Sequence, residues 1–284
     1  GREKALARAE RRANADASVL LAALKRSRGL YQLARNPLIL SLIALVHYRR
    51  RDLPQGRAKL YQECLEILLD VWDQEDKELE IPGPSLKAKE IILREIAYYF
   101  HDKELPEAGR DELEGLIAPL IRTLECPTGP AETLRQIEER SGILVSKAID
   151  RYGFAHRTLQ EYLVARELAD SPEKAGQVLD HVSDEPWREV ILLYVGLIPE
   201  ASQLVGALLD QGDDANYNAL ILAGGCLAED VRVEPELKDR ALERLEIPFE
   251  TEPFKHVVGV QDFVNIFGQV RLAREGWEAE RDRE

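Results

Sequence analysis

The side chain best placed to contact a ligand is that of His156, one of five histidines in the chain. It follows a predicted β-strand and stands two residues before Thr158, which is expected to cap a helix. Backbone N–H groups and the macrodipole favour an anion at the N-terminus of a helix. The position therefore indicates either a phosphate contact or a packed histidine that bridges strand and helix. For the other four histidines we expect ordinary surface or capping roles.

Catalytic motifs are absent from the sequence. It contains no Gly-x-x-x-x-Gly-Lys-Ser/Thr motif and no Gly-Lys dipeptide, so nothing in it can hold a triphosphate as a P-loop does. Metalloprotease, nucleophile-elbow and EF-hand motifs are also missing. The apolar run followed by acids at residues 68–76 is similar to a Walker B strand, but the helical spacing of residues 57–73 explains it better. We therefore predict no catalytic residue, no metal site and no enzymatic turnover by this chain alone.

Composition and charge narrow the class of protein. The chain has 284 residues, of which 45% are hydrophobic, so it can bury a core without disulfides or a structural metal. Its 38 basic and 52 acidic residues give a net charge of −14, which repels the phosphate backbone of nucleic acids. The three cysteines, Cys64, Cys126 and Cys226, form no Cys-x-x-Cys pair and fit buried thiols in a reducing compartment, hence a cytoplasmic location.

No segment predicts membrane insertion or export. The longest apolar run, residues 38–46, is about half the ~20 residues that span a bilayer. Residues 1–14 are charged and polar, unlike a signal peptide. Because the sequence contains no methionine, we expect it to be a piece of a longer chain.

The first third of the chain predicts a bundle of helices. Asn36 and Pro37 form a helix start signal, and the helix that follows is apolar all round through Val46, so it should be buried on every side. Its end carries three arginines, residues 49–51, which fit either a phosphate patch or cations that stabilise a helix C-terminus. An amphipathic helix over residues 57–73 follows, and the break at residues 81–85 predicts a domain boundary.

The middle third has the element order of a winged-helix domain. Ser85 and a capping box that begins at Asp111 predict two helices, and a third helix spans residues 131–140. Residues 142–155 predict a small β-hairpin, and a second capping box at Thr158 opens a closing helix. A DNA-reading third helix would be basic, but here Glu132, Glu138 and Glu139 oppose Arg135 and Arg140, which favours a packing or lid role.

The last third predicts stacked helices. Helices of similar length are expected at residues 186–196, 200–210, 215–228 and 235–245, separated by Pro, Gly or Asp turns. Such short apolar helices cannot stand alone and would pack as an α-solenoid. The tail beyond Phe254 shows a weaker helical pattern.

Two stretches carry a family resemblance. Residues 33–40, LARNPLIL, and 53–61, LPQGRAKLY, resemble the helical-domain motifs of NACHT-type signal-transduction NTPases of the STAND class. The segments 140–145, RSGILV, and 152–165, YGFAHRTLQEYLVA, resemble the winged-helix motif of the same family. The resemblance covers residues 15–170, and the array beyond is more weakly similar to the HEAT-like repeats that often follow.

The resemblance implies a mostly α fold in three domains: a NACHT-associated helical domain at residues 1–82, a winged-helix lid at 83–170 and HEAT-like helical repeats at 171–284. It implies that the P-loop, the Walker B acids and the Mg²⁺ site lie in an upstream nucleotide-binding domain. In the family, the histidine that matches His156 contacts the β-phosphate of bound ADP, and the proline that matches Pro37 packs on the adenine. Leu159 stands where the family often has Phe, which should alter only packing.

The implied function is that of the regulatory lid and sensor portion of a switch between ADP and ATP in innate-immunity-type signalling. Its partners would be the upstream nucleotide-binding domain, proteins or ligands at the repeats, and further copies when activation drives oligomerisation. This fragment alone should bind no nucleotide tightly. Two alternatives remain, a purely structural helical interaction scaffold and a winged-helix DNA regulator.

Overall fold

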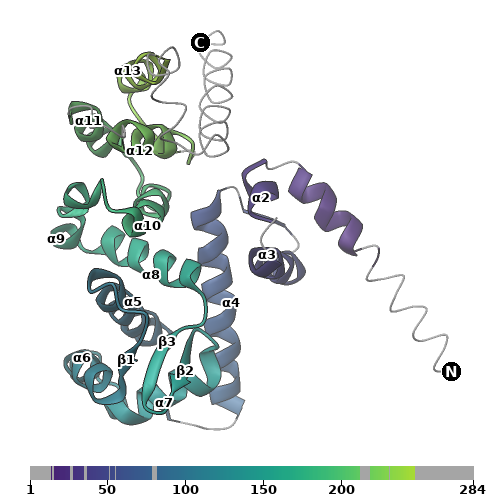
Figure 1. Cartoon of the computed structure of the whole chain (residues 1–284). Coiled ribbons are helices and arrows are strands. Elements are labelled where there is room, and N and C mark those ends of the chain that lie inside the picture. Colours follow the sequence, from purple (N-terminus) through teal and green to yellow (C-terminus); the bar gives the residue numbers. More distant parts are fainter. Residues whose placement is uncertain are drawn as a thin grey trace.

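Helices dominate the described part of the chain, and one small antiparallel sheet interrupts them (Figure 1). The structure is a computed structural model. The residues it describes are 14, 16–25, 28–34, 37–50, 52–54, 56–78, 82–211, 218–229 and 231–246.

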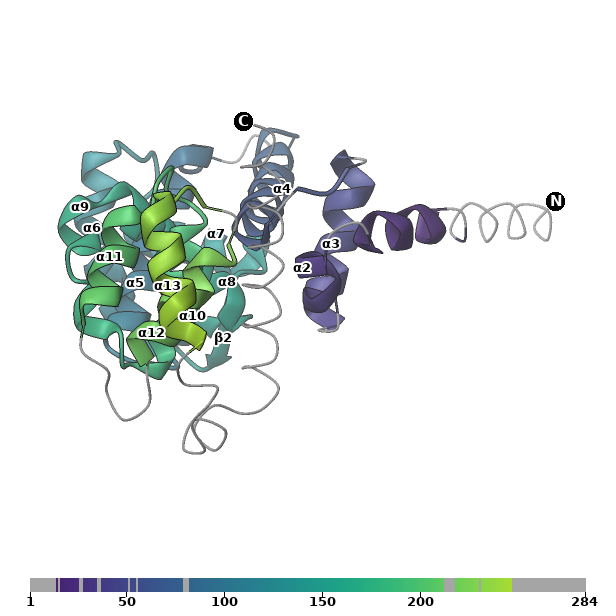
Figure 2. The same ribbon diagram turned by 90° about the horizontal axis from the view of Figure 1, so that it is seen from above.

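The N-terminal helices lie on one side of a long central helix. Helices α2 (Arg28–Leu33) and α3 (Pro37–Arg50) lie to one side of α4 (Arg57–Glu78), and the winged-helix elements lie to the other (Figures 1 and 2). The predicted start at Pro37 is confirmed, and the acidic run at residues 68–76 lies inside α4, so it is not a Walker B strand.

The prediction that α3 is buried on every side was wrong. Leu40 is 39% exposed and Tyr48 is 61% exposed, although Ile43 and Val46 are fully buried. Helix α3 packs on α4, and its opposite face is open in the described part of the chain. The apolar pattern of a helix shows that its surface favours burial. It does not show whether residues of the same chain pack on that surface.

The winged-helix arrangement is confirmed from α5 to α8. The antiparallel sheet has the order β1-β3-β2, and the β2–β3 hairpin turns at Ile149 and Asp150, whose φ is +52°. Strand β1 was missed by the sequence analysis because two residues give no alternation to detect. The elements are α5 (Leu86–Asp102), β1 (Ala108–Gly109), α6 (Arg110–Thr123), α7 (Pro130–Ser141), β2 (Leu144–Ala148), β3 (Arg151–Phe154) and α8 (Arg157–Asp170).

One predicted helix cap is confirmed and another is corrected. The Ser85 hydroxyl accepts a hydrogen bond from Ala88 N at 3.2 Å and caps α5 as expected. The cap of α6 is Gly109 rather than Asp111, because β1 ends at Gly109 and the Glu112 carboxylate reaches back to Gly109 N at 3.2 Å. The capping box therefore begins at Gly109, two residues before the predicted Asp111.

Aromatic side chains join the central helices into one core. Tyr61 of α4 lies 5.9 Å from Tyr162 of α8 between ring centroids, and Phe100 of α5 meets Phe154 of β3 edge-on at 5.6 Å. All four rings are buried. Helix α8 is the shared support, since α4, α5 and α10 all pack on it.

The four predicted C-terminal helices are confirmed, with ends that agree to within two residues; the predicted start of the third, at residue 215, lies outside the described residues. Their stacking as HEAT-like repeats stays a prediction, and the tail beyond Phe254 lies outside the described residues. Among the described residues, no helix is long and apolar enough to cross a membrane. The elements after α8 are α9 (Pro172–Ala175), η1 (Val178–His181), α10 (Glu185–Val195), α11 (Ser202–Asp210), α12 (Asn218–Leu227) and α13 (Pro235–Glu246).

Candidate functional site

His156 is the N-cap residue of α8. Its backbone is extended, with φ −141° and ψ 126°, and its carbonyl accepts bonds from the N–H groups of Leu159 and Gln160 at 3.2 and 3.3 Å. The residue before it is fixed to the sheet, because Ala155 N donates to the Ile143 carbonyl at 2.8 Å. The side chain of His156 is exposed and makes no capping hydrogen bond. A rigid strand exit thus presents an accessible imidazole at the start of a helix.

The predicted capping box at Thr158 does not form. Thr158 is the second residue inside α8, and the Glu161 carboxylate binds the Arg157 guanidinium at 2.8 Å instead of returning to the backbone. Burial raises the pKa of Glu161, and the bond from Arg157 partly offsets this effect. The N-cap of α8 is therefore two residues earlier than predicted, at His156 instead of Thr158.

The charges at this helix end suit an anion. The first turn of α8 contains no acidic residue, and the Arg157 side chain is 67% exposed. The partial positive charge of the helix N-terminus, the imidazole of His156 and the guanidinium of Arg157 therefore share one end of α8. The donor set fits the phosphate groups of a nucleotide, which are oxygen acceptors with negative charge.

A second histidine near this helix end is buried. The ring of His101 meets Trp187 edge-on at 4.7 Å, and His181 stacks on Trp187 at 4.0 Å, with its Nδ1 2.8 Å from the Asp184 carboxylate. Burial lowers the pKa of His101 to about 4, and the positive charges of Arg157 and His181 act in the same direction. The sequence analysis assigned His101 and His181 ordinary roles, since nothing in their local sequence signals this cluster.

Pro37, the predicted adenine contact, is the first residue of α3, which packs on α4. It is exposed, and its carbonyl accepts a bond from the Ser41 hydroxyl at 2.9 Å. No interaction among the described residues joins Pro37 to His156; α3 and α8 both pack on α4. A shared nucleotide contact would therefore need groups outside the described residues.

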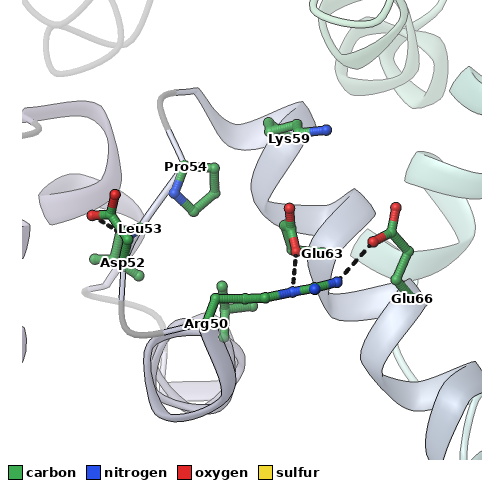
Figure 3. A pocket seen from close by; sticks show the side chains of 8 residues that line it. Arg50, Asp52, Leu53, Pro54, Lys59, Glu63 and Glu66 are labelled. Carbon is green, nitrogen blue, oxygen red and sulfur yellow. Dashed lines mark hydrogen bonds and ion pairs between the residues drawn. The ribbon is translucent and has the colours of Figure 1, made fainter.

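The groove at the other end of α3 is not a phosphate site. It has a volume of about 530 Å³ and lies between the end of α3 and the first turns of α4 (Figure 3). Arg50 reaches across it to Glu63 at 2.7 Å and to Glu66 at 3.0 Å. The lining has two cations and three carboxylates, so its net charge is 2 − 3 = −1. Of the two interpretations of the arginine triplet, Arg50 does not support the phosphate patch.

The third helix of the winged-helix domain offers no free cationic face. The Arg135 guanidinium on α7 is held by Glu132 at 2.6 Å and by Glu139 at 2.5 Å. Gln136 donates to the Pro82 carbonyl at 3.0 Å and anchors the helix to the segment before α5. The helix is thus tied down by its own carboxylates and by packing. Among the described residues, no cluster of His, Cys, Asp and Glu could hold a metal ion.

Comparison with known proteins identifies the domain that carries His156. Residues 57–168 match the family of winged helix-turn-helix domains C-terminal to NACHT. The match begins at the first residue of α4 and includes His156, whereas Pro37 lies outside it. No curated protein matches the chain. Residues 57–168 therefore form a winged-helix domain similar to those found C-terminal to NACHT.

Proposed function

We propose that the chain is the regulatory lid and sensor portion of a nucleotide-switched signal-transduction NTPase. The observation that carries the proposal is the exposed imidazole of His156 at the N-cap of α8, inside the matched domain. A lid needs a rigid support and an accessible anion contact, and the β3–α8 junction supplies both.

ADP bound in an upstream NACHT domain supplies the negative phosphate charge to which the lid would bind. His156 would donate a hydrogen bond to a phosphate oxygen, and the N-terminus of α8 would add its partial positive charge. The open face of α3 and the exposed Pro37 would lie toward the same upstream domain. Exchange of ADP for ATP would remove the contact and release the lid.

The remaining parts of the proposal concern the whole protein. The C-terminal helices would bind the partner or ligand that triggers release, and released copies would oligomerise in the cytoplasm. The separation of roles follows the element order, since α8 joins the winged-helix domain to α10 and the helices beyond it.

The first test is the nucleotide content of the full-length protein that includes its NACHT domain. We expect ADP to copurify at close to one equivalent and to be released on denaturation. The isolated 284-residue chain serves as the control and should retain none. A full-length protein that purifies without nucleotide, and that binds none when it is added, would contradict the proposal and favour an interaction scaffold.

A further inference from the structure

Arg57 joins the start of α4 to two helices far along the chain. Its Nη1 atom lies 2.7 and 3.0 Å from the two carboxylate oxygens of Glu189 in α10. Its Nε and Nη2 atoms lie 2.8 and 2.7 Å from Oε1 of Glu229, two residues beyond the end of α12. The Arg57 side chain is 18% exposed and that of Glu229 is 12% exposed, so this ion pair is largely removed from water, whereas Glu189 is 33% exposed.

The backbones around Arg57 approach closely. A Cβ atom at Gly196, just after α10, would lie 2.9 Å from Cβ of Ala58, the residue next to Arg57. A Cβ atom at Gly225 in α12 would lie 2.8 Å from Cδ2 of Leu192 in α10. Glycines at these two positions allow α4, α10 and α12 to meet, and the start of α4 lies at the level of α10 in Figure 1.

Arg57 is the cation that faces the two acids at this junction, and with it the net charge of the three side chains is 1 − 2 = −1. One guanidinium serves the two carboxylates of Glu189 and Glu229, and the third acid nearby, Glu161, is held by Arg157. Without the guanidinium, two partly buried carboxylates would face the junction with no counter-ion. Removing one partner of a buried ion pair is strongly destabilising, whereas replacing all partners by apolar residues of similar volume is often tolerated.

A separate anchor lies two residues before Glu189 in the same helix, α10. Trp187, 3% exposed, lies near the start of α10 and contacts His101 and Tyr98 of α5 and His181 of η1. These contacts hold α10 to the winged-helix domain without any charge. Loss of the ion pairs would therefore free the helices that follow α10, while α10 itself stays docked through Trp187 and through apolar residues that remain buried up to Val195.

We propose that Arg57 is a charge clamp that decides whether the helices α11 and α12 stay docked on α10 and the winged-helix domain. The clamp is a conformational device of the fold and does not depend on a nucleotide. One residue at the start of α4 would control the docking of a segment more than 130 residues away, since Glu189 and Glu229 follow Arg57 by 132 and 172 residues.

The test is hydrogen–deuterium exchange of the 284-residue chain. In Arg57→Met we expect roughly tenfold or faster amide exchange across α11 and α12, with unchanged exchange in α5 and α7. The triple variant Arg57→Met, Glu189→Met, Glu229→Met replaces all three charges by apolar side chains of similar volume and should restore slow exchange in those helices. Arg135→Met, which removes an exposed arginine held by two carboxylates, is the matched control and should change nothing beyond α7.

Three results would overturn the clamp. They are wild-type exchange in Arg57→Met, equal acceleration in α5 and in α12, and a triple variant that exchanges as fast as Arg57→Met. If Arg57→Met does not fold, the triple variant decides: slow exchange in α11 and α12 supports the clamp, and failure of the triple variant to fold contradicts it.

Discussion

At the scale of single residues, two histidines of the winged-helix domain occupy opposite environments. His156 is exposed at the N-cap of α8, where an imidazole N–H can donate to an anion. His101 is 5% exposed, and its Nε2 atom is buried with no hydrogen-bond partner among the described residues. The same side chain therefore suits ligand contact at one position and core packing at the other.

The buried His101 predicts a pH-dependent stability. Its pKa is about 4 in the folded protein and about 6.5 in the unfolded chain, so the unfolded state binds more protons between these values. Stability should be fully present above pH 6.5 and should fall by up to about 3 kcal/mol as the pH drops toward 4. Urea unfolding at pH 7 and pH 4.5 measures this loss.

His101→Phe is the matched variant, because a ring remains to contact Trp187 while the titrating group is gone. We expect a smaller difference between the free energies of unfolding at the two pH values than in the wild type. An unchanged difference in the variant would show that His101 does not cause the pH dependence.

The structural position of a functional residue could be predicted only where the sequence around it carries a signal. The strand exit followed by a polar residue placed His156 at a helix start, and the structure moved the cap from Thr158 to His156 itself. Whether His156 and Pro37 bind nucleotide stays a prediction. Arg57 was missed, because an ion pair to Glu189 and Glu229 leaves no pattern in the sequence around any of the three residues.

At the scale of elements, the contact between α4 and α10 depends on the missing side chain of Gly196. Gly196→Ala would place its Cβ 2.9 Å from Cβ of Ala58, which forces the two backbones apart. We expect the free energy of unfolding to fall by about 1–3 kcal/mol, the usual cost of overpacking. Thermal or urea unfolding followed by circular dichroism measures the change.

Gly115→Ala is the control for this substitution. Gly115 lies in α6, and a Cβ atom there meets nothing within 4 Å. Since alanine favours a helix over glycine by up to about 1 kcal/mol, this variant should be slightly more stable than the wild type. Equal stability changes in the two variants would refute the packing argument at Gly196.

Helices with a clear apolar face were predictable, while short strands and open faces were not. The four C-terminal helices follow their predicted ranges because Pro, Gly and Asp turns separate them. Strand β1 was not predicted because it consists of two residues, and these are defined as a strand only by their pairing with β3, which lies more than 40 residues later in the sequence. The exposed face of α3 was not predicted because the apolar periodicity of a helix does not identify what packs on each of its faces.

At the scale of the whole molecule, charge argues against nucleic-acid binding. The net charge is −14, and the exposed arginine of α7 is held by carboxylates of its own helix. We expect no binding of duplex DNA in a fluorescence-anisotropy titration at 50 mM salt. Binding that weakens steeply between 50 and 200 mM salt would reveal phosphate contacts and would revive the DNA-regulator alternative.

The boundaries of the three predicted domains stay predictions. The matched family includes α4, which lies before the predicted boundary at residue 83, and ends near the predicted boundary at residue 170. The Pro- and Gly-rich residues 81–85 predicted the break before α5. The packing of α4 on both α3 and the winged-helix elements could not be predicted from the composition of the chain.

The most direct test of the lid is the rate at which bound ADP leaves the full-length protein with its NACHT domain. A hydrogen bond to a charged group contributes about 1.5–3 kcal/mol, so His156→Ala should accelerate release of a fluorescent ADP analogue roughly 10- to 150-fold. Lys147→Ala, which removes an exposed cation from β2 of the same domain, should release it at the wild-type rate. Wild-type release from His156→Ala, or equal acceleration in both variants, would contradict a phosphate contact at His156.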